Sequence, residues 1–202
     1  MDSQEQQYFN ELAQRWDEMR SLNPDKIAYL IQLAGVAPGD TVLDVGTGTG
    51  VLIPFLSEAV GDTGHVTAID FAEAMVAKAA QKYAHLSGIS YMAADIMKYQ
   101  TESRYSKVIC LNFFPHMKDK QAFLLRVHEL LVPQGSLVIM HDLSRQAVNS
   151  IHATSDIVRE DRLPPSLAVA DMLAQAGFAV EAAMDNEELY FVSGKAVRGH
   201  SD

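Results

Sequence analysis

VLDVGTGTGVL, residues 42–52, is an apolar run that leads into three alternating glycines and then into further apolar residues. Glycine has no Cβ atom, so a segment that contains Gly46, Gly48 and Gly50 can turn sharply and bring its backbone N–H groups close to a ligand. The sequence therefore predicts a buried strand, a nucleotide-binding turn and a helix in this order.

The spacing of the glycines distinguishes between possible ligands. A dinucleotide fingerprint has the pattern G-x-G-x-x-G. Its third glycine would fall on Val51 when counted from Gly46, and on Ile53 when counted from Gly48. The spacing therefore disfavours an NAD-dependent oxidoreductase. A glycine-rich turn without any ligand is a further alternative, but alternating glycines weaken the start of a helix without structural gain.

Composition limits the class of protein. The chain has 202 residues, 48% of them apolar, and a net charge of −10. It has no Lys/Arg run, so we expect no nucleic-acid partner. No apolar stretch approaches the roughly 20 residues that span a bilayer, and the polar N-terminus lacks a signal-peptide pattern, so we expect a cytoplasmic protein without a membrane contact. Cys110, the single cysteine, excludes an internal disulfide and a CxxC zinc site.

Apolar periodicity predicts alternating strands and helices. Strands are expected at residues 41–45, 65–69, 89–93, 107–112, 136–140, 178–183 and 188–192. Helices are expected at residues 4–19, 24–34, 51–60, 72–83, 118–131 and 165–176. Residues 133–135 are expected to form a turn. The last two strands are only about four residues apart, too few for a parallel crossover, so they predict an antiparallel hairpin.

These elements predict an α/β fold, a three-layer α-β-α sandwich. Its seven-stranded sheet is mostly parallel, with one antiparallel strand in the C-terminal hairpin. We expect a single domain over residues 1–194 and a flexible tail over 195–202. The segment of about residues 141–164 is expected to form an insertion with a helix of its own. Because ligands bind at the carboxyl ends of the strands in such sheets, this insertion is a candidate substrate lid.

Two acidic residues follow strands in the predicted sheet. Asp70 ends the second strand, where a carboxylate can accept hydrogen bonds from both ribose hydroxyls of a nucleotide. The alternative is a helix cap, because Asp70 stands three residues before Glu73. Asp95 follows the third strand, and its alternative role is that of an ordinary turn residue.

The pattern D-x-G-x-G-x-G at residues 44–50 resembles the first motif of class I S-adenosylmethionine-dependent methyltransferases. Residues 9–17, FNELAQRWD, are similar to the FDxxAxxWD opening of many small-molecule members. PQGSL at 133–137 resembles the LKPGG turn, with Gln134 in place of a glycine. The resemblance extends over about residues 8–192. It implies S-adenosyl-L-methionine as cofactor and a flap over it, formed by the first helices at about residues 1–36.

The resemblance also implies a set of cofactor-binding residues. Asp95 and Ile96 would contact adenine, and Asn112 would contact the amino-acid end through its backbone. The complete set is Asp44, Gly46, Thr47, Gly48, Gly50, Asp70, Phe71, Met75, Asp95, Ile96 and Asn112. Asn112 begins the segment NFFPH, which departs from the Asn/Asp-Pro-Pro-Tyr/Phe motif of base and glutamine N-methyltransferases and disfavours that chemistry. A single cysteine disfavours arsenite methylation.

Three histidines follow the predicted strands or lie in the insertion: His116, His141 and His152. A neutral imidazole could contact the acceptor or remove a proton from its hydroxyl or thiol group. Three imidazoles could instead hold a divalent metal, or these could be ordinary surface residues. The identity of any metal stays open. Arg145, Arg159 and Arg162 could bind an anionic acceptor, although salt bridges in solvent are the expected role of at least two.

The predicted function is methyl transfer to a small-molecule acceptor by direct displacement. The protein would supply alignment and desolvation for this reaction, so the sequence offers no universal catalytic residue. The alternative is a regulatory module that binds the cofactor without catalysis. Residues 4–19 could also form a dimerisation surface, which would make the protein a homodimer.

Overall fold

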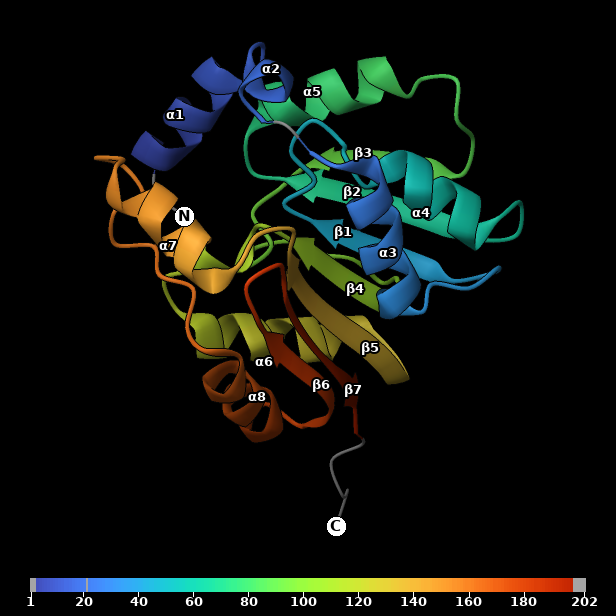
Figure 1. The fold of residues 1–202 in the computed structure, drawn as a ribbon. Coiled ribbons are helices and arrows are strands. Elements are labelled where there is room, and N and C mark those ends of the chain that lie inside the picture. The colour runs from blue at the N-terminus through green and yellow to red at the C-terminus, as the bar shows by residue number, and fades with distance from the viewer. Residues whose placement is uncertain (1–2, 21, 198–202) are drawn as a thin grey trace. The chain divides into compact units, whose positions relative to one another are not determined.

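The computed structural model describes residues 3–20 and 22–197 (Figure 1). Its contacts divide the chain into two compact units, Met1–Gln100 and Thr101–Asp202. The glycine turn lies in the first unit and the three histidines lie in the second. That all of them belong to a single methyltransferase domain remains a prediction.

The first unit contains three parallel strands and five helices among its described residues. The strand order is β3-β2-β1, and Val66 is paired with Val42 on one side and with Ile89 on the other. Its elements are α1 (Ser3–Leu12), α2 (Trp16–Met19), α3 (Pro24–Ala34), β1 (Thr41–Val45), α4 (Ile53–Val60), β2 (His65–Asp70), α5 (Glu73–Lys82) and β3 (Ile89–Ala93).

Local chemistry explains where these elements begin and end. Helix α3 starts at Asn23, whose side chain accepts hydrogen bonds from the backbone N–H groups of Asp25 and Lys26. It ends at Gly35, which has a left-handed φ of 61°. Val42 and Leu43 in β1 are completely buried, and helices α4 and α5 pack against β2. The first unit therefore has its own apolar core beneath the glycine turn.

The second unit carries the antiparallel part of the fold. Its strand order is β4-β5-β7-β6; β4 and β5 are parallel, and β7 runs antiparallel to both β5 and β6. Its elements are β4 (Tyr105–Leu111), η1 (Phe114–His116), α6 (Lys120–Leu130), β5 (Leu131–His141), α7 (Arg145–Ala153), α8 (Ser166–Gln175), β6 (Phe178–Asp185) and β7 (Tyr190–Ala196).

The expected α/β fold class is confirmed. The described residues include the seven strands of a mixed, mostly parallel sheet, and within this part of the chain the C-terminal hairpin contains the one antiparallel strand. Helix α6 packs against β5, and α8 packs against β6 and β7. None of the helices among the described residues has the length and apolarity needed to cross a membrane.

Three expectations about individual segments were wrong. The helix expected at residues 4–19 breaks after Leu12, because the Lys78 ammonium donates to the carbonyls of Ala13 and Gln14 and so replaces the next helical bonds. Strand β5 begins at Leu131 and includes the expected turn as an irregularity, where Gln134 has a φ of 66°.

The third correction concerns the C-terminus. Lys195 and Ala196 belong to β7 instead of the expected tail, because they pair with Ala179 and Phe178 of β6. Residues 198–202 of the expected tail lie outside the described residues.

The glycine turn depends on backbone conformations that side chains disfavour. Gly46, Gly48 and Gly50 have φ values of 73°, 54° and 85°. A Cβ atom on Gly50 would also lie 2.7 Å from Ile53 Cδ1 and 2.9 Å from Tyr83 Cε2. Glycine at position 50 thus satisfies both a backbone and a packing requirement.

We therefore expect Gly50→Ala to lower the free energy of unfolding by about 2–4 kcal/mol, the sum of a left-handed backbone penalty and overpacking. Gly35→Ala is the matched control, because Gly35 has a φ of 61° but no atom within 4 Å of the position that a Cβ atom would occupy. Urea unfolding measures both variants. Equal losses would show that the packing around Gly50 does not matter.

Candidate functional site

The glycine turn is fastened to the end of β2. The backbone N–H groups of Gly46 and Thr47 donate to the carbonyl of Ile69 at 2.9 and 3.0 Å. The next N–H group, on Gly48, donates to Asp70 Oδ2 at 2.9 Å. These three bonds fix the direction of the turn at the carboxyl end of two neighbouring strands.

Asp70 joins this turn to the start of α5. Its Oδ1 accepts a hydrogen bond from the Ala72 N–H at 2.9 Å, and the residue is 9% exposed. The N-cap of α5 is Ala72, which makes no side-chain cap bond. Asp70 is therefore not the N-cap of α5, which was the alternative role suggested by the sequence. Its side chain instead closes a short turn to Ala72, and the ribose contact remains a prediction.

Asp44 is a buried carboxyl group beneath the turn. It is 1% exposed, and both of its oxygens lack a hydrogen-bond partner among the described residues. Burial raises the pKa of Asp44 to about 7, and the negative charge of Asp70 adds to this effect. The Thr47 hydroxyl lowers the pKa and has the largest effect after burial, although its position is outside normal hydrogen-bond geometry. A buried carboxylate in this state favours a positively charged partner.

The N-terminal segment lies against the glycine turn through Asp17. The Thr49 hydroxyl donates to Asp17 Oδ1 at 2.5 Å, and the Lys82 ammonium donates to Oδ2 at 2.9 Å. Burial raises the pKa of Asp17, but these two partners outweigh it and hold the pKa below its usual value. Asp17 therefore links α2, the turn and α5, a role that the sequence did not indicate.

An apolar cluster completes this contact. Its buried members are Ala13, Ala72 and Met75, and Phe9, Trp16 and Phe71 pack against them. The Phe9 ring meets Trp16 and Phe71 edge-on at 5.7 and 5.9 Å. Two predicted cofactor residues, Phe71 and Met75, thus share a cluster with the predicted flap.

Asp95 and Ile96 follow the end of β3. Asp95 is half-buried, and its Oδ1 accepts a hydrogen bond from the Met97 N–H at 3.0 Å. Ile96 is 3% exposed. The turn role that the sequence left open for Asp95 is present, and the adenine contact remains a prediction.

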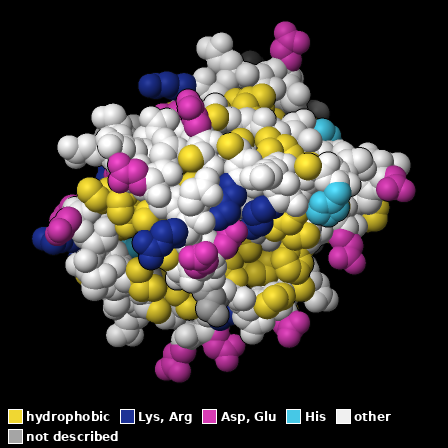
Figure 2. All heavy atoms as spheres, turned by 90° about the horizontal axis from the view of Figure 1, so that it is seen from above, with side chains coloured by type: hydrophobic (Ala, Val, Ile, Leu, Met, Phe, Trp, Pro, Cys, Tyr) yellow, Lys and Arg dark blue, Asp and Glu magenta, His cyan; other side chains and the backbone are white. Residues whose placement is uncertain are grey.

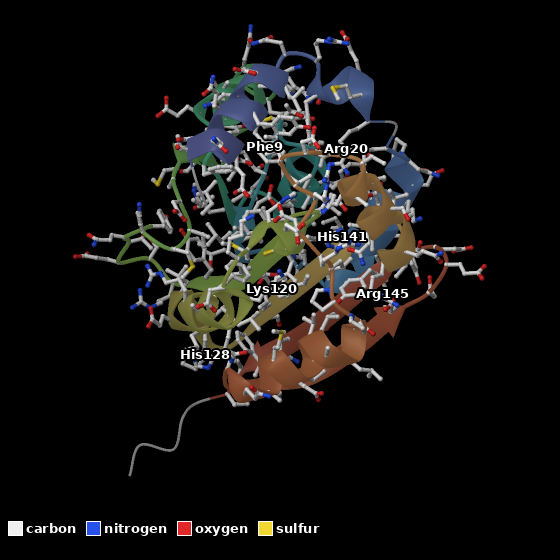
Figure 3. The ribbon with its side chains drawn as sticks, turned by 90° about the vertical axis from the view of Figure 1, so that its left-hand side faces the viewer. Phe9, Arg20, Lys120, His128, His141 and Arg145 are labelled. Atoms are coloured by element: carbon white, nitrogen blue, oxygen red, sulfur yellow. The ribbon has the colours of Figure 1, made fainter. Side chains whose placement is uncertain are left out.

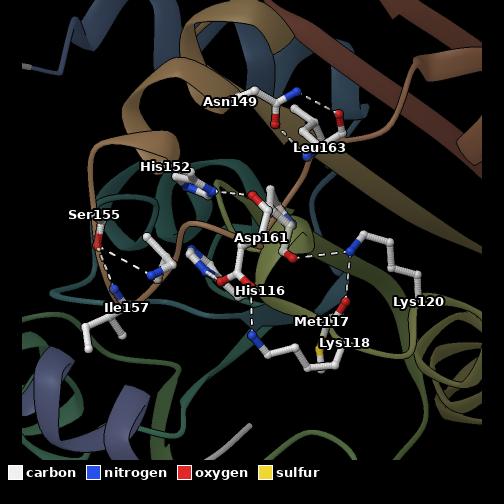
Figure 4. A network of polar contacts seen from close by, with 12 residues as sticks. His116, Met117, Lys118, Lys120, Asn149, His152, Ser155, Ile157, Asp161 and Leu163 are labelled. Atoms are coloured by element: carbon white, nitrogen blue, oxygen red, sulfur yellow. Dashed lines mark hydrogen bonds and ion pairs between the residues drawn. The ribbon is translucent and has the colours of Figure 1, made fainter.

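In the second unit, His116 and His152 come together around Asp161 (Figure 4). The centroids of their rings lie 5.0 Å apart, although the two residues are 36 positions apart in the sequence. His116 Nδ1 donates to Asp161 Oδ2 at 2.7 Å, and the Lys118 ammonium donates to Oδ1 at 2.9 Å. Burial alone would raise the pKa of Asp161, but these two hydrogen bonds hold the pKa below its usual value.

His152 has a defined tautomer. Its Nδ1 lies 2.6 Å from the backbone carbonyl of Asp161, which can only accept, so Nδ1 carries the proton. Burial lowers the pKa of His152, and the positive charges of His116 and Arg162 lower it further. The neutral ring therefore has its lone pair on Nε2, as a proton acceptor requires.

The third predicted histidine has a different environment. His141, labelled in Figure 3, ends β5 and is 1% exposed. Its ring meets the Tyr190 ring edge-on, with 5.7 Å between the centroids. Asn112, the cofactor residue predicted after β4, has a φ of 55° and donates from its side chain to Asp142 Oδ1 at 2.8 Å. Burial holds His141 at its strand end, whereas hydrogen bonds to Asp142 and to the Met140 carbonyl hold Asn112.

The metal and anion alternatives differ in their support. Among the described residues, no three His, Cys, Asp or Glu side chains converge as metal ligands would. Arg145 pairs with Asp185 at 2.6 Å, and Arg159 pairs with Asp156. These two arginines make the expected salt bridges.

Charges of both signs occupy the surface. On the face shown in Figure 2, Lys and Arg side chains are interspersed with Asp and Glu rather than gathered in one stretch.

Lys118, which binds Asp161, is 54% exposed and left no recognisable signal in the sequence. Its role appears only when β4, η1 and the segment after α7 are brought together.

Comparison with known proteins identifies the family. Residues 42–135 match the methyltransferase domain family. A ubiquinone biosynthesis O-methyltransferase of Bordetella avium (strain 197N) is 30% identical, and the match covers 76% of this chain and 66% of that protein. A ubiquinone/menaquinone biosynthesis C-methyltransferase of Enterobacter sp. (strain 638) is 25% identical over 96% of this chain and 75% of that protein.

The chain spans 59–66% of the length of three ubiquinone biosynthesis O-methyltransferases that it matches, the Bordetella avium protein among them. A crystal structure of an S-adenosylmethionine-dependent methyltransferase from Aquifex aeolicus has the same fold, with a TM-score of 0.74 and 22% identity over 93% of this chain and 98% of that one. The sequence motifs and the fold agree with these matches, and the chain belongs to the class I methyltransferase family, whose cofactor is S-adenosylmethionine.

Proposed function

We propose that this chain transfers a methyl group from S-adenosylmethionine to a small-molecule acceptor. The observation that carries the proposal is the glycine turn, which is bonded to Asp70 and lies over the buried carboxyl group of Asp44, which has no hydrogen-bond partner among the described residues. The O- and C-methyltransferases among the relatives support an organic small molecule as acceptor.

The residues of the first unit fit this cofactor. S-adenosylmethionine carries an ammonium group and a sulfonium group, and the Asp44 carboxylate lacks a hydrogen-bond partner of its own among the described residues. We propose that the glycine turn and Asp44 hold the amino-acid part, Asp70 the ribose, and Asp95 with Ile96 the adenine. Phe71 and Met75 would supply apolar contacts. When bound, the cofactor supplies an electrophilic methyl group, and the protein needs only to align it and exclude water.

We propose that the acceptor has a hydroxyl group and that His152 receives its proton. The Asp161 carbonyl holds the Nδ1–H of His152, so Nε2 is the basic atom. His116, oriented by Asp161, would contact the acceptor, as would His141 at the end of β5. By accepting the O–H proton, His152 would leave an oxygen lone pair ready to receive the methyl group that the bound cofactor would supply.

Binding and turnover test the function separately. We expect the protein to bind S-adenosylhomocysteine in calorimetry, and to release it from S-adenosylmethionine when supplied with a panel of hydroxylated aromatic compounds. Absence of binding would overturn the proposal. Binding without turnover on any acceptor would favour a regulatory module.

Asp70→Ala should weaken S-adenosylhomocysteine binding by at least about tenfold, because each hydrogen bond to a charged group contributes about 1.5–3 kcal/mol. Asp40→Ala is the matched control: the Asp40 carboxylate also accepts a backbone N–H, from Ala37, in an exposed turn of the same unit. Calorimetry measures both variants. An unchanged affinity for Asp70→Ala would reject the ribose contact.

Asp44 predicts that cofactor affinity depends on pH. Its pKa of about 7 in the free protein means that the carboxyl group is mostly protonated below this pH. A cationic ligand binds the charged form, so affinity for S-adenosylmethionine should fall by up to about tenfold for each pH unit below 7. In Asp44→Asn the binding should be weak and nearly independent of pH. Calorimetry between about pH 5.5 and 8 measures the slope, and a flat wild-type profile would contradict the assignment.

His152 can be tested without a known acceptor. Nuclear magnetic resonance titration should give it a pKa below 6.5, with the proton of the neutral ring on Nδ1. His128→Gln, at a half-buried position of α6 that contacts Phe178 instead of the histidine pair, should leave this pKa unchanged. A pKa above 6.5, or a neutral ring protonated on Nε2, would remove the argument for His152 as the base.

A further inference from the structure

A polar hollow lies in the second unit, and its lining includes the residues that follow His152 and Asp161 in the sequence, Ala153 and Arg162. It has a volume of about 410 Å³, within the range of about 300–1,000 Å³ that small-molecule sites occupy. Five of its lining residues lie on one side of α7 and the sixth comes from the segment that follows the helix: Arg145, Gln146, Asn149, Ser150, Ala153 and Arg162. Two of the six carry a positive charge and none carries a negative one.

The three arginines of this region differ in their charge partners. Arg145, labelled in Figure 3, is half-buried and forms an ion pair with Asp185. Arg159 lies outside the hollow and forms an ion pair with Asp156. Arg162 has neither a hydrogen bond nor an ion pair within residues 3–20 and 22–197. Its guanidinium therefore brings an uncompensated positive charge to the hollow, in a chain whose net charge is −10.

The backbone around Arg162 is held firmly on both sides. Asn149 donates to the Leu163 carbonyl at 3.1 Å and accepts from the Leu163 N–H at 2.8 Å. Asp161 on the other side is 2% exposed and binds His116 and Lys118. Arg162 is itself exposed between two fixed neighbours, so a ligand would need to order little more than its side chain.

We propose that this hollow binds the carboxylate group of the methyl acceptor through Arg162. The planar guanidinium can donate two parallel hydrogen bonds to a carboxylate, while Gln146, Asn149 and Ser150 offer neutral polar groups around it. The inference rests on the proposed function, since it assigns a chemical class to the acceptor of that reaction.

The hollow is electrostatically connected to His152. The positive charge of Arg162 is one of the causes that lower the pKa of His152, beside burial and the charge of His116, whereas Asp161 opposes them. An anion bound to Arg162 would cancel part of this charge. His152 is thus a reporter of occupancy that does not depend on turnover.

Benzoate, benzamide and inorganic phosphate are the probes. We expect benzoate to bind the wild-type protein and to raise the pKa of His152, both measured by nuclear magnetic resonance titration. Arg162→Gln should weaken benzoate binding by about tenfold, the loss of a charge-assisted hydrogen bond, and abolish the pKa response. Arg159→Gln, the matched control in the same segment, should change neither. Because Arg162 is exposed, its replacement leaves the core unchanged.

Several results would overturn the inference: no benzoate binding, equal binding to Arg162→Gln, or benzamide binding as tightly as benzoate. Tighter binding of phosphate than of benzoate would assign the hollow to a phosphate group instead of a carboxylate. S-adenosylhomocysteine affinity is measured on the same samples. If the protein binds S-adenosylhomocysteine but not benzoate, only the carboxylate site is rejected. If it does not bind S-adenosylhomocysteine, the proposed function itself is rejected.

Discussion

The hydrogen bond between the Gly48 N–H and the Asp70 carboxylate is the contact on which the first unit depends. It closes a turn that only glycine can make easily at three positions, and it holds that turn against the end of a neighbouring strand. Asp70 also fixes the chain as it enters α5, through the Ala72 N–H. Helix α5 then carries Lys78 and Lys82, which anchor the N-terminal segment through Ala13, Gln14 and Asp17. One carboxylate thereby connects the turn with the helices around it.

Two buried carboxyl groups show how differently the two units use charge. Asp161 has partners on both oxygens, and these keep it ionised. Asp44 has none among the described residues, and burial raises its pKa to about 7. A buried polar group without a partner destabilises a fold, so its presence is most easily explained by a ligand that supplies the missing donor. Asp161 therefore fixes the positions of His116 and Lys118, whereas Asp44 is available to bind a cationic ligand.

Much of the fold was accessible from the sequence because strand and helix periodicity is local. Thr41–Val45 and Ile89–Ala93 were predicted with their observed bounds, and the four-residue spacing of the last two strands was enough to require a hairpin. The errors arose where distant groups intervene. Lys78 ends α1 from a position 65 residues away, and pairing with Phe178 and Ala179 keeps Lys195 and Ala196 in a strand. No local pattern around residues 13 or 195 contains that information.

The sequence by itself determined the family and the donor motif, because the glycine spacing in VLDVGTGTGVL reflects a backbone requirement that is written in consecutive residues. Only the tertiary structure decided the state of the polar side chains. It selected His116 and His152 as a pair, gave Asp161 and Lys118 their roles, and left Arg162 with a different environment from Arg145 and Arg159. The physical reason is that hydrogen bonds and burial, which set protonation and charge, depend on atoms brought together by folding rather than on neighbours along the chain.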